Sequence, residues 1–196
     1  MPTSRTPARK PAAPAAAAAD AIALLSADHQ AVAKLHKKFE RLVKAKAPAS
    51  ERGAVAQQIC HALTLHATAE EEIFYPPVRA AIGKPDLMDE ADIEHACAKD
   101  LIAQIESLSP EDDKYDARVI VLCEYVAHHV EEEETEMFPK AKRVKTLDMQ
   151  ALGEAIAARK AALAAELGIE PDGAAAKSRP TSRRTTRPNT AVGRRA

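Results

Sequence analysis

The chain carries one pattern of histidine, glutamate and proline twice, and this repeat restricts its fold more than any other feature. In each copy a histidine is followed by a glutamate four residues later and by a proline ten residues later. The two copies are His66, Glu70 and Pro76, and His129, Glu133 and Pro139. Side chains four residues apart lie on one face of a helix. The repeat therefore predicts two similar helices, each presenting a histidine and a glutamate together.

The repeat extends toward the N-terminal side of each copy. The pair Asp28-His29 lies 37 residues before His66, and the pair Glu94-His95 lies 34 residues before His129. Each half of the chain thus supplies one histidine and then a His-x-x-x-Glu unit. Two such halves predict one site made of four histidines and two glutamates.

Apolar residues between the two ends of the chain recur at helical spacing, as in Ile22, Leu25, Val32 and Leu35. Pro48 and Ser50 predict the start of a second helix, which Pro76-Pro77 should disturb near its end. Gly83-Lys84-Pro85 precedes a third helix.

Ser109 and Pro110 predict the N-cap and first turn of a fourth helix that runs to about Phe138. A fifth helical stretch covers Thr146 to Leu167, and Gly168 suits its C-terminal cap. Short connections favour antiparallel neighbours. We therefore expect an all-α fold: an up-down antiparallel four-helix bundle over residues 20–142, with an additional C-terminal helix within residues 143–170.

The two ends of the chain have a different composition from its middle. Residues 1–19 are rich in Pro and Ala, and residues 171–196 are rich in Ser, Thr, Arg and Pro, so we expect both to be disordered tails. The formal charge of -1 combines +3 over residues 1–19, +6 over residues 172–196 and therefore -10 between them. An acidic body argues against a nucleic-acid binder as a whole, and leaves contact through the basic C-terminal tail as the last-ranked partner.

Cys60, Cys97 and Cys123 are isolated and odd in number, so they predict neither a disulfide framework nor a thiolate metal site. We interpret Cys60 and Cys123, which lie six residues before the two repeat histidines, as small packing residues. The alanine-rich stretch near the N-terminus is too short and too weakly apolar for a membrane span or a signal segment. The expectation is a cytoplasmic protein with no membrane association.

The repeat histidines are in phase with apolar residues: His66 with Leu63, and His129 with Val126. Carboxylates and imidazoles directed into an apolar core are costly without a partner, and a metal removes that cost. A set of nitrogen and oxygen donors without thiolate suits iron, with manganese or zinc ranked behind it, and two carboxylates can bridge a metal pair. The predicted ligands of this dinuclear centre are His29, His66, Glu70, His95, His129 and Glu133.

Each of these histidines taken singly would be read as an ordinary helix residue near glutamates, and only the matched halves outweigh that interpretation. The pair His128-Glu132 has the same spacing, but its face also carries Glu124 and Glu136, so His129-Glu133 is preferred. The acidic runs Glu71-Glu72 and Glu131, Glu132 and Glu134 are interpreted as solvated faces. Tyr75 is assigned either to core packing or to a hydrogen bond with a metal-bound oxygen.

On these motifs, His66 to Pro76 and His129 to Pro139, the chain resembles the haemerythrin-like family, the HHE cation-binding domain. The resemblance covers approximately Asp20 to Lys142. It implies a four-helix bundle with a non-haem di-iron centre, in which the four histidines are terminal ligands and Glu70 and Glu133 are bridges. The oxygen-carrying members have a further histidine one turn before His95, where this chain has Ala91, so their oxygen carriage does not transfer directly.

Three functions are therefore expected in order. The first is a metal-binding protein that takes oxygen, nitric oxide or peroxide as a ligand, in sensing or in iron and oxidant handling. The second is a di-iron enzyme with peroxidase-like, catalase-like or nitric oxide-consuming activity, so the sequence does not decide whether the protein is an enzyme. The third is a structural bundle whose basic tails contact nucleic acid. Oligomeric state is not predicted.

Overall fold

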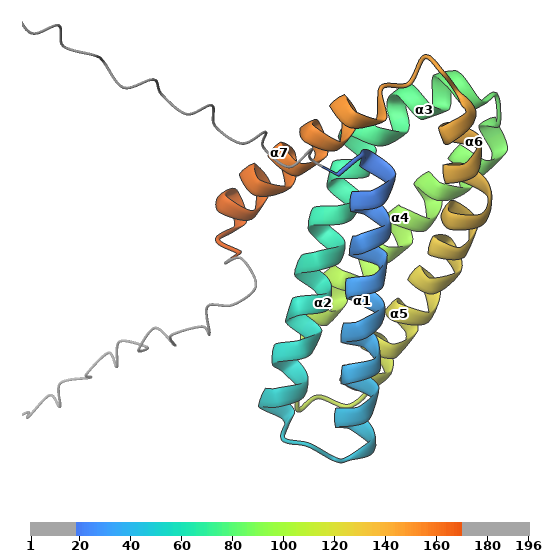
Figure 1. Cartoon of the computed structure of the whole chain (residues 1–196). Helices are drawn as coiled ribbons and strands as arrows, with labels where there is room; N and C mark the ends of the chain where they lie inside the picture. The colour runs from blue at the N-terminus through green and yellow to red at the C-terminus, as the bar shows by residue number, and fades with distance from the viewer. Residues whose placement is uncertain (1–18, 170–196) are drawn as a thin grey trace, which may run out of the picture.

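The computed structural model describes residues 19–169, and these form a bundle of helices in which four long rods run side by side (Figure 1). The expected all-α bundle with an appended helix is confirmed. The predicted tails lie outside the described residues, except Ala19. The helices, in chain order, are α1 (Ala21–Lys44), α2 (Ala49–Ala69), α3 (Tyr75–Ile82), α4 (Pro85–Glu106), α5 (Tyr115–Glu132), α6 (Phe138–Arg143) and α7 (Met149–Leu167).

The four rods are α1, α2 continued by α3, α4, and α5 continued by α6. The second and the fourth contain a wider turn of helix. The π-helical segment η1 (Glu70–Phe74) joins α2 to α3, and η2 (Glu133–Met137) joins α5 to α6. In each, the backbone N–H five residues after the glutamate donates to the glutamate carbonyl, Tyr75 to Glu70 and Phe138 to Glu133. A proline follows at once in both rods. Proline lacks an N–H and its ring crowds the carbonyl four residues earlier, so the wider turn accommodates it.

The helix ends follow from local chemistry. Asp20 accepts a hydrogen bond from the backbone of Ala23 at the start of α1, and Asp148 accepts one from Ala151 at the start of α7. Gly83 ends α3 in the left-handed conformation that lacks a steric cost only for glycine. The helix ends thus set the short turns that reverse the chain.

The predicted start of the fourth helix at Ser109-Pro110 is wrong. Residues 109–114 form turns in which the Asp112 side chain accepts from the Ser109 N–H, and Lys114 takes a positive φ of 69° just before α5 begins. The ring of Pro110 lies so close to Gly53 on α2 that a Cβ there would be 2.5 Å from its Cγ. Pro110 therefore packs against a neighbouring rod and does not open a helix.

The apolar interior has two parts. One cluster includes Phe39, Ile59 and Val119 toward the end of the bundle where α1 turns into α2. The other includes Phe74, Met88 and Phe138 at the opposite end, where Ile156 of α7 also joins it. α7 crosses α1 and α2 at this second end (Figure 1). The histidines and glutamates of the repeat lie between the two clusters.

None of the helices within residues 19–169 combines the length and the apolar character that crossing a membrane requires.

Candidate metal centre

The six residues singled out by the repeat lie together in the interior. His29 comes from α1, His66 from α2, His95 from α4 and His129 from α5, while Glu70 and Glu133 are the first residues of η1 and η2. Leaving aside Tyr and Cys, these six are the buried polar or charged side chains found in the described range, 19–169. The helical phase therefore directs all six predicted residues inward.

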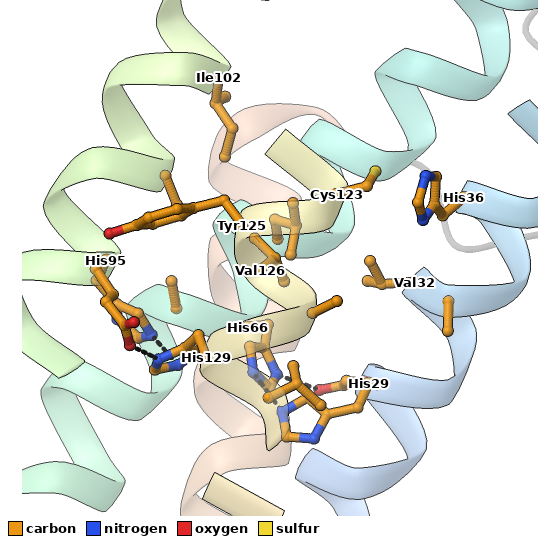
Figure 2. Close-up of a pocket in the computed structure, with 18 of the residues that line it drawn as sticks. His29, Val32, His36, His66, His95, Ile102, Cys123, Tyr125, Val126 and His129 are labelled. Atoms are coloured by element: carbon orange, nitrogen blue, oxygen red, sulfur yellow. Dashed lines mark hydrogen bonds and ion pairs between the residues drawn. The ribbon is translucent and has the colours of Figure 1, made fainter. Parts of the chain in front are cut away.

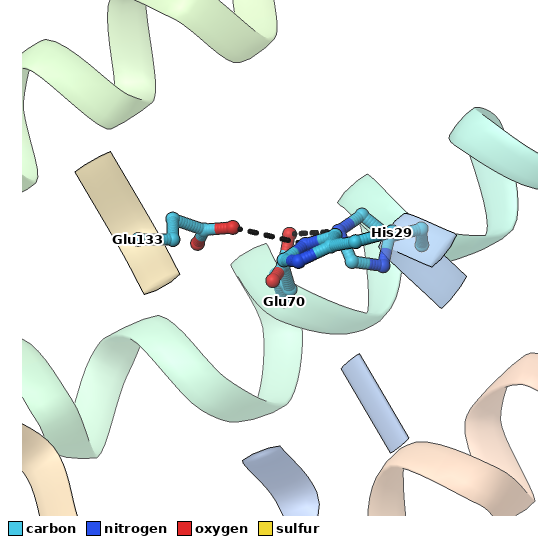
Figure 3. Close-up of side chains that lie close together, drawn as sticks. His29, Glu70 and Glu133 are labelled. Atoms are coloured by element: carbon cyan, nitrogen blue, oxygen red, sulfur yellow. Dashed lines mark hydrogen bonds and ion pairs between the residues drawn. The ribbon is translucent and has the colours of Figure 1, made fainter. Parts of the chain in front are cut away.

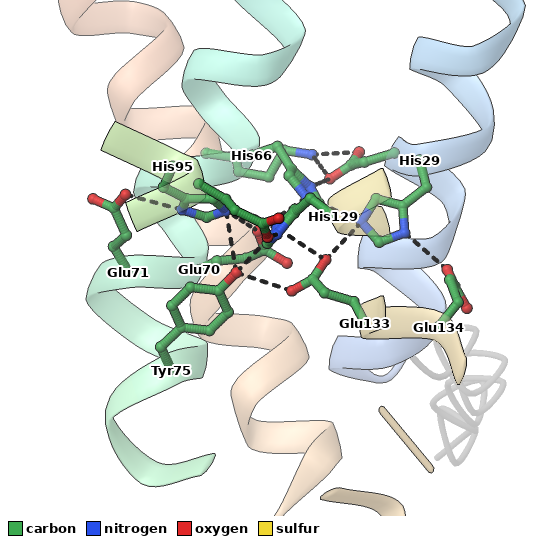
Figure 4. Close-up of polar contacts among 12 residues, drawn as sticks. His29, His66, Glu70, Glu71, Tyr75, His95, His129, Glu133 and Glu134 are labelled. Carbon is green, nitrogen blue, oxygen red and sulfur yellow. Dashed lines mark hydrogen bonds and ion pairs between the residues drawn. The ribbon is translucent and has the colours of Figure 1, made fainter. Parts of the chain in front are cut away.

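The histidines form two pairs, one from each half of the chain. The Nε2 atoms of His29 and His66 are 3.1 Å apart, and those of His95 and His129 are 3.0 Å apart (Figure 4). A metal–nitrogen bond of about 2.1 Å places neighbouring octahedral donors about 3 Å apart. Each pair thus has the spacing of two donors to one ion.

Each glutamate spans the two histidine pairs. Glu70 Oε2 lies 3.0 Å from His66 Nε2 and 3.6 Å from His95 Nε2. Glu133 Oε2 lies 3.2 Å from His29 Nε2 and 3.5 Å from His129 Nε2, and Figure 3 shows Glu70 and Glu133 converging beside His29. A carboxylate in this position is placed to bridge two ions, one at each histidine pair.

The carboxylate oxygens show that the cluster is incomplete as a hydrogen-bonded unit. Both side-chain oxygens of Glu70, and Oε2 of Glu133, are buried and have no hydrogen-bond partner. Buried polar atoms in native proteins are nearly always paired, and an unpaired carboxylate is costly. Cations coordinated by these oxygens would satisfy them, so the residues present fit a metal pair.

The outer nitrogen of every histidine faces its own carboxylate. The four Nδ1 contacts are His29 with Glu134 at 2.8 Å, His66 with Asp28 at 3.2 Å, His95 with Glu71 at 2.9 Å and His129 with Glu94 at 2.7 Å. An ionised carboxylate only accepts, so Nδ1 carries a proton and Nε2 is the ring nitrogen directed to the interior. This is the arrangement that orients metal-binding histidines.

These partners correct one interpretation of the sequence. Glu71 and Glu134 belong to acidic runs that were expected to be solvated, yet each binds a buried histidine of the other half of the chain. The repeat held the missing signal: an acidic residue directly follows each bridging glutamate, and one directly precedes His29 and His95. His128, by contrast, is exposed beside Glu132, as its polar face predicts.

The charged groups of the cluster shift one another's pKa values. Burial opposes ionisation of His66, but Glu70 and Asp28 outweigh it and raise the pKa of His66 to about 10. Burial also opposes ionisation of Glu133, but the nearby histidines, His29 foremost, outweigh it and lower the pKa of Glu133 to about 2. Burial lowers the pKa of His95. The centre therefore holds Glu133 ionised, and a buried ionised carboxylate attracts positive charge.

The two halves of the centre differ at one position. Tyr75 precedes the first repeat proline, and its hydroxyl donates to Glu133 Oε1 at 2.9 Å while lying 3.1 Å from His95 Nε2 and 3.3 Å from His129 Nε2. The equivalent residue of the second repeat, Phe138, stacks on His29 with ring centroids 5.7 Å apart. Only one half of the centre thus has a phenol beside its histidine pair.

The bundle and its buried cluster define a helical protein of the cation-binding class. A family model described as the Hemerythrin HHE cation binding domain matches residues 20–141, and the chain belongs to that family. A solved structure of a hemerythrin HHE cation binding domain-containing protein from Mycobacterium kansasii has the same fold, with a TM-score of 0.62, 24% identity, and coverage of 76% of this chain and 89% of that one. The resemblance stated from the motifs is confirmed.

A relative with a different name shares part of this sequence. The chain is 41% identical over 81 residues to a protein named DNA nickase from Nostoc sp. strain PCC 7120. The match covers 41% of this chain and only 23% of that protein. The chain therefore spans less than a quarter of that relative.

Proposed function

We propose that this protein holds two non-haem iron ions and binds a small oxidant or diatomic ligand, oxygen, nitric oxide or peroxide, at that centre. The observation that carries the proposal is the pair of buried glutamates, each contacting one histidine of each half and each with at least one oxygen that lacks a hydrogen-bond donor. Donors of nitrogen and oxygen without thiolate suit iron ahead of zinc, and iron supplies redox chemistry and open coordination positions. Sensing and the handling of iron or oxidants both use such a centre.

Tyr75 is the proposed replacement for the histidine that this chain lacks at Ala91. Ala91 is buried in the same apolar cluster as Tyr75, and the Tyr75 hydroxyl lies against the His95 and His129 pair. Burial and the neighbouring glutamates raise the pKa of Tyr75 in the metal-free chain. A bound cation reverses that preference, because coordination favours the deprotonated phenol.

The Tyr75 proposal is tested in the iron-loaded, oxidised protein. A phenolate bound to ferric iron gives a visible charge-transfer absorption, which we expect in the native chain and expect to vanish in Tyr75→Phe with the iron content kept. The matched control is Tyr125→Phe, on a half-buried tyrosine that precedes His129 by four residues. An identical visible spectrum in Tyr75→Phe would reject the phenol as a ligand.

The number of oxidant molecules that react per chain distinguishes ligand binding from catalysis. We expect the reduced, iron-loaded protein to form one stable spectroscopic adduct for each centre when oxygen, nitric oxide or peroxide is added. Consumption of many equivalents of oxidant per chain would instead establish the second function, a peroxidase-like, catalase-like or nitric oxide-consuming enzyme. Failure of all three ligands to perturb the spectrum of an iron-loaded protein would reject both.

Contact with nucleic acid is a further candidate function, different in class from ligand binding and from catalysis. The relative named DNA nickase is the observation that favours it. Seven basic residues and one aspartate between 172 and 196 give that segment a net charge of +6. Binding of this kind weakens steeply with salt because counterions are released. The expected result is duplex binding at low salt by the full chain that is lost when residues 172–196 are removed, and no binding at low salt would dismiss it.

A further inference from the structure

A cavity of about 400 Å³ lies inside the bundle next to the four histidines. Figure 2 shows the histidines at one end of this space and Val32, Val126 and Cys123 beyond them. Small-molecule sites occupy roughly 300 to 1,000 Å³. A diatomic ligand has only two heavy atoms, and a water molecule, with one, takes up about 30 Å³ of liquid volume. The cavity therefore has room for a much larger molecule than oxygen or nitric oxide.

The cavity exists because the two sides of the histidine layer are filled differently. Each rod places a residue three positions from its histidine on the cavity side, and these four residues are Val32, Leu63, Ala98 and Val126. The opposite side carries larger side chains, among them Phe74, Phe138 and Met88, which are fully or almost fully buried. On the cavity side, valine, leucine and alanine side chains leave a gap. On the opposite side, aromatic rings and methionine fill the corresponding space.

Most of the surface along the cavity is apolar, and His36, Cys123 and Tyr125 also line it. At its inner end lie the imidazoles of His29, His66, His95 and His129, with Asp28 and Glu94 beside them. Lys37 and Glu40 on α1 and Lys99 on α4 line the cavity and are also exposed, so these three charged residues lie at its opening. Ala33 of α1 and Ala127 of α5 likewise line it while exposed, which puts an entrance between these helices.

We propose that this cavity binds an amphipathic organic molecule whose single oxygen-bearing head group reaches the metal centre and whose apolar chain lies against Val32, Leu63 and Val126. The head-group half of this inference rests on the proposed metal pair, because two divalent ions exceed the charge of Glu70 and Glu133 and attract an anionic oxygen. The chain half rests on the cavity alone. The substrate or ligand class is thus a medium-chain acid or its oxygenated analogue.

The probes are octanoate and butanoate, added to the iron-loaded full chain and followed by calorimetry. Removing a CH₂ group from water strengthens binding about fourfold, so octanoate should bind on the order of 100-fold tighter than butanoate. Octanoate should also perturb the visible spectrum of the iron. An iron-loaded protein that binds the two acids equally well would overturn the proposal.

The location of the site is tested by filling the cavity. Ala98→Phe places a ring in the space beside His95 and should abolish octanoate binding while the bundle stays folded. Ala103→Phe makes the same change on an exposed position of the same helix and should leave binding intact. Octanoate binding that survives Ala98→Phe unchanged would show that the acid binds elsewhere, and the proposal would fail.

A neutral probe separates this inference from the metal proposal. 1-Octanol has the same chain without an anionic head, so it should bind the metal-free chain and lose that binding in Ala98→Phe. A protein that never takes up iron contradicts the proposed function, and 1-octanol still reports on the cavity in that case. Absence of 1-octanol binding to a folded metal-free chain would overturn the assignment of the cavity to an apolar ligand.

Discussion

Each buried histidine depends on a carboxylate partner for its orientation, and the partners are arranged by a simple rule. Asp28 and Glu94 bind the second histidine of their own half, whereas Glu71 and Glu134 bind the first histidine of the other half. The bonds to Glu71 and Glu134 therefore link the two halves across the centre. Removing one such carboxylate changes the ring orientation and basicity of one histidine only.

Replacing Glu94 by Gln tests this dependence. The amide no longer accepts the His129 Nδ1 proton as a charged partner, so we expect metal affinity to fall about 10-fold to 100-fold. Glu90→Gln is the control, because Glu90 lies one turn earlier on the same helix and is exposed. Competition with a chelator of known affinity measures both variants. Equal affinities would show that Glu94 does not support His129.

The raised pKa of His66 makes the metal-free chain sensitive to alkali. A group whose pKa is higher in the folded than in the unfolded state stabilises the fold fully below the unfolded value and loses that contribution as pH rises through the folded value. For His66 these values are 6.5 and about 10. Denaturant unfolding of the metal-free chain should therefore show stability falling over this window.

The variant His66→Gln supplies the reference for that measurement, because it removes the titrating group and keeps a polar side chain. The difference in unfolding free energy between the native chain and His66→Gln should shrink between pH 6.5 and about 10. The metal-loaded protein should behave oppositely, because protons compete with the metal for the imidazole. A pH-independent difference in the metal-free chain would contradict the assigned pKa.

Among the elements, the two π-helical segments are the features most closely tied to the centre. Each begins at one of the two buried glutamates, Glu70 or Glu133, and is followed within two residues by a proline, Pro76 or Pro139. The wider turn follows directly on the His-x-x-x-Glu unit in each rod, and such insertions are frequent at functional sites. The same geometry in both rods keeps the two glutamates equivalent.

Helix α7 is held against the centre by side chains and by close backbone packing. Lys160 donates to Asp28, the partner of His66, and Arg159 donates to Glu72 of η1. Gly153 lies so close to the start of α1 that a Cβ would be 2.4 Å from the carbonyl oxygen of Ala19. The appended helix thus contacts the outer layer of the candidate centre.

Gly153→Ala tests the seating of α7. Alanine gains about 1 kcal/mol of helix propensity over glycine, but overpacking against backbone costs about 1 to 3 kcal/mol. Because the contact is with backbone atoms of α1, the clash should dominate and Tm should fall. Ala157→Ser, on an exposed position of α7, should change stability by less than about 0.5 kcal/mol. A higher Tm in Gly153→Ala would contradict the close packing.

The sequence was informative where its period and spacing are strong. The helical phase placed all six candidate ligands in the interior, and Gly83 and Gly168 marked helix ends correctly. It failed at Ser109-Pro110, because the packing of Pro110 on Gly53 involves residues far apart in the chain. The cavity was not predictable either, since it depends on how Ala98 and Val126 from different helices face one another.

At the scale of the whole molecule, the candidate centre joins all four rods at the level between the two apolar clusters. Each rod contributes one histidine, and two also contribute a glutamate, so a metal pair would cross-link all four rods in addition to the apolar packing and the histidine–carboxylate hydrogen bonds that join them. On the side of the four histidines that faces the cavity, side chains do not fill the interior. Metal binding should therefore contribute strongly to the stability of the bundle.

Removing the metal should lower Tm appreciably. A ligand present at about 1,000 times its dissociation constant stabilises a fold by about 4 kcal/mol, which corresponds to a shift on the order of 10 °C for a chain of this size. Scanning calorimetry before and after chelation measures the shift, and adding iron back should restore the original Tm. An unchanged Tm would mean that the bundle does not use a metal for its stability.

The central claim is that the buried histidines and glutamates bind a metal pair, and elemental analysis tests it most directly. Protein made with iron supplied should contain about two iron atoms per chain, as should His128→Ala, which alters an exposed histidine. The neighbouring change His129→Ala should lose iron while circular dichroism still reports a helical bundle. A native chain without stoichiometric metal, or a His129→Ala variant that keeps its full iron content, would contradict the claim.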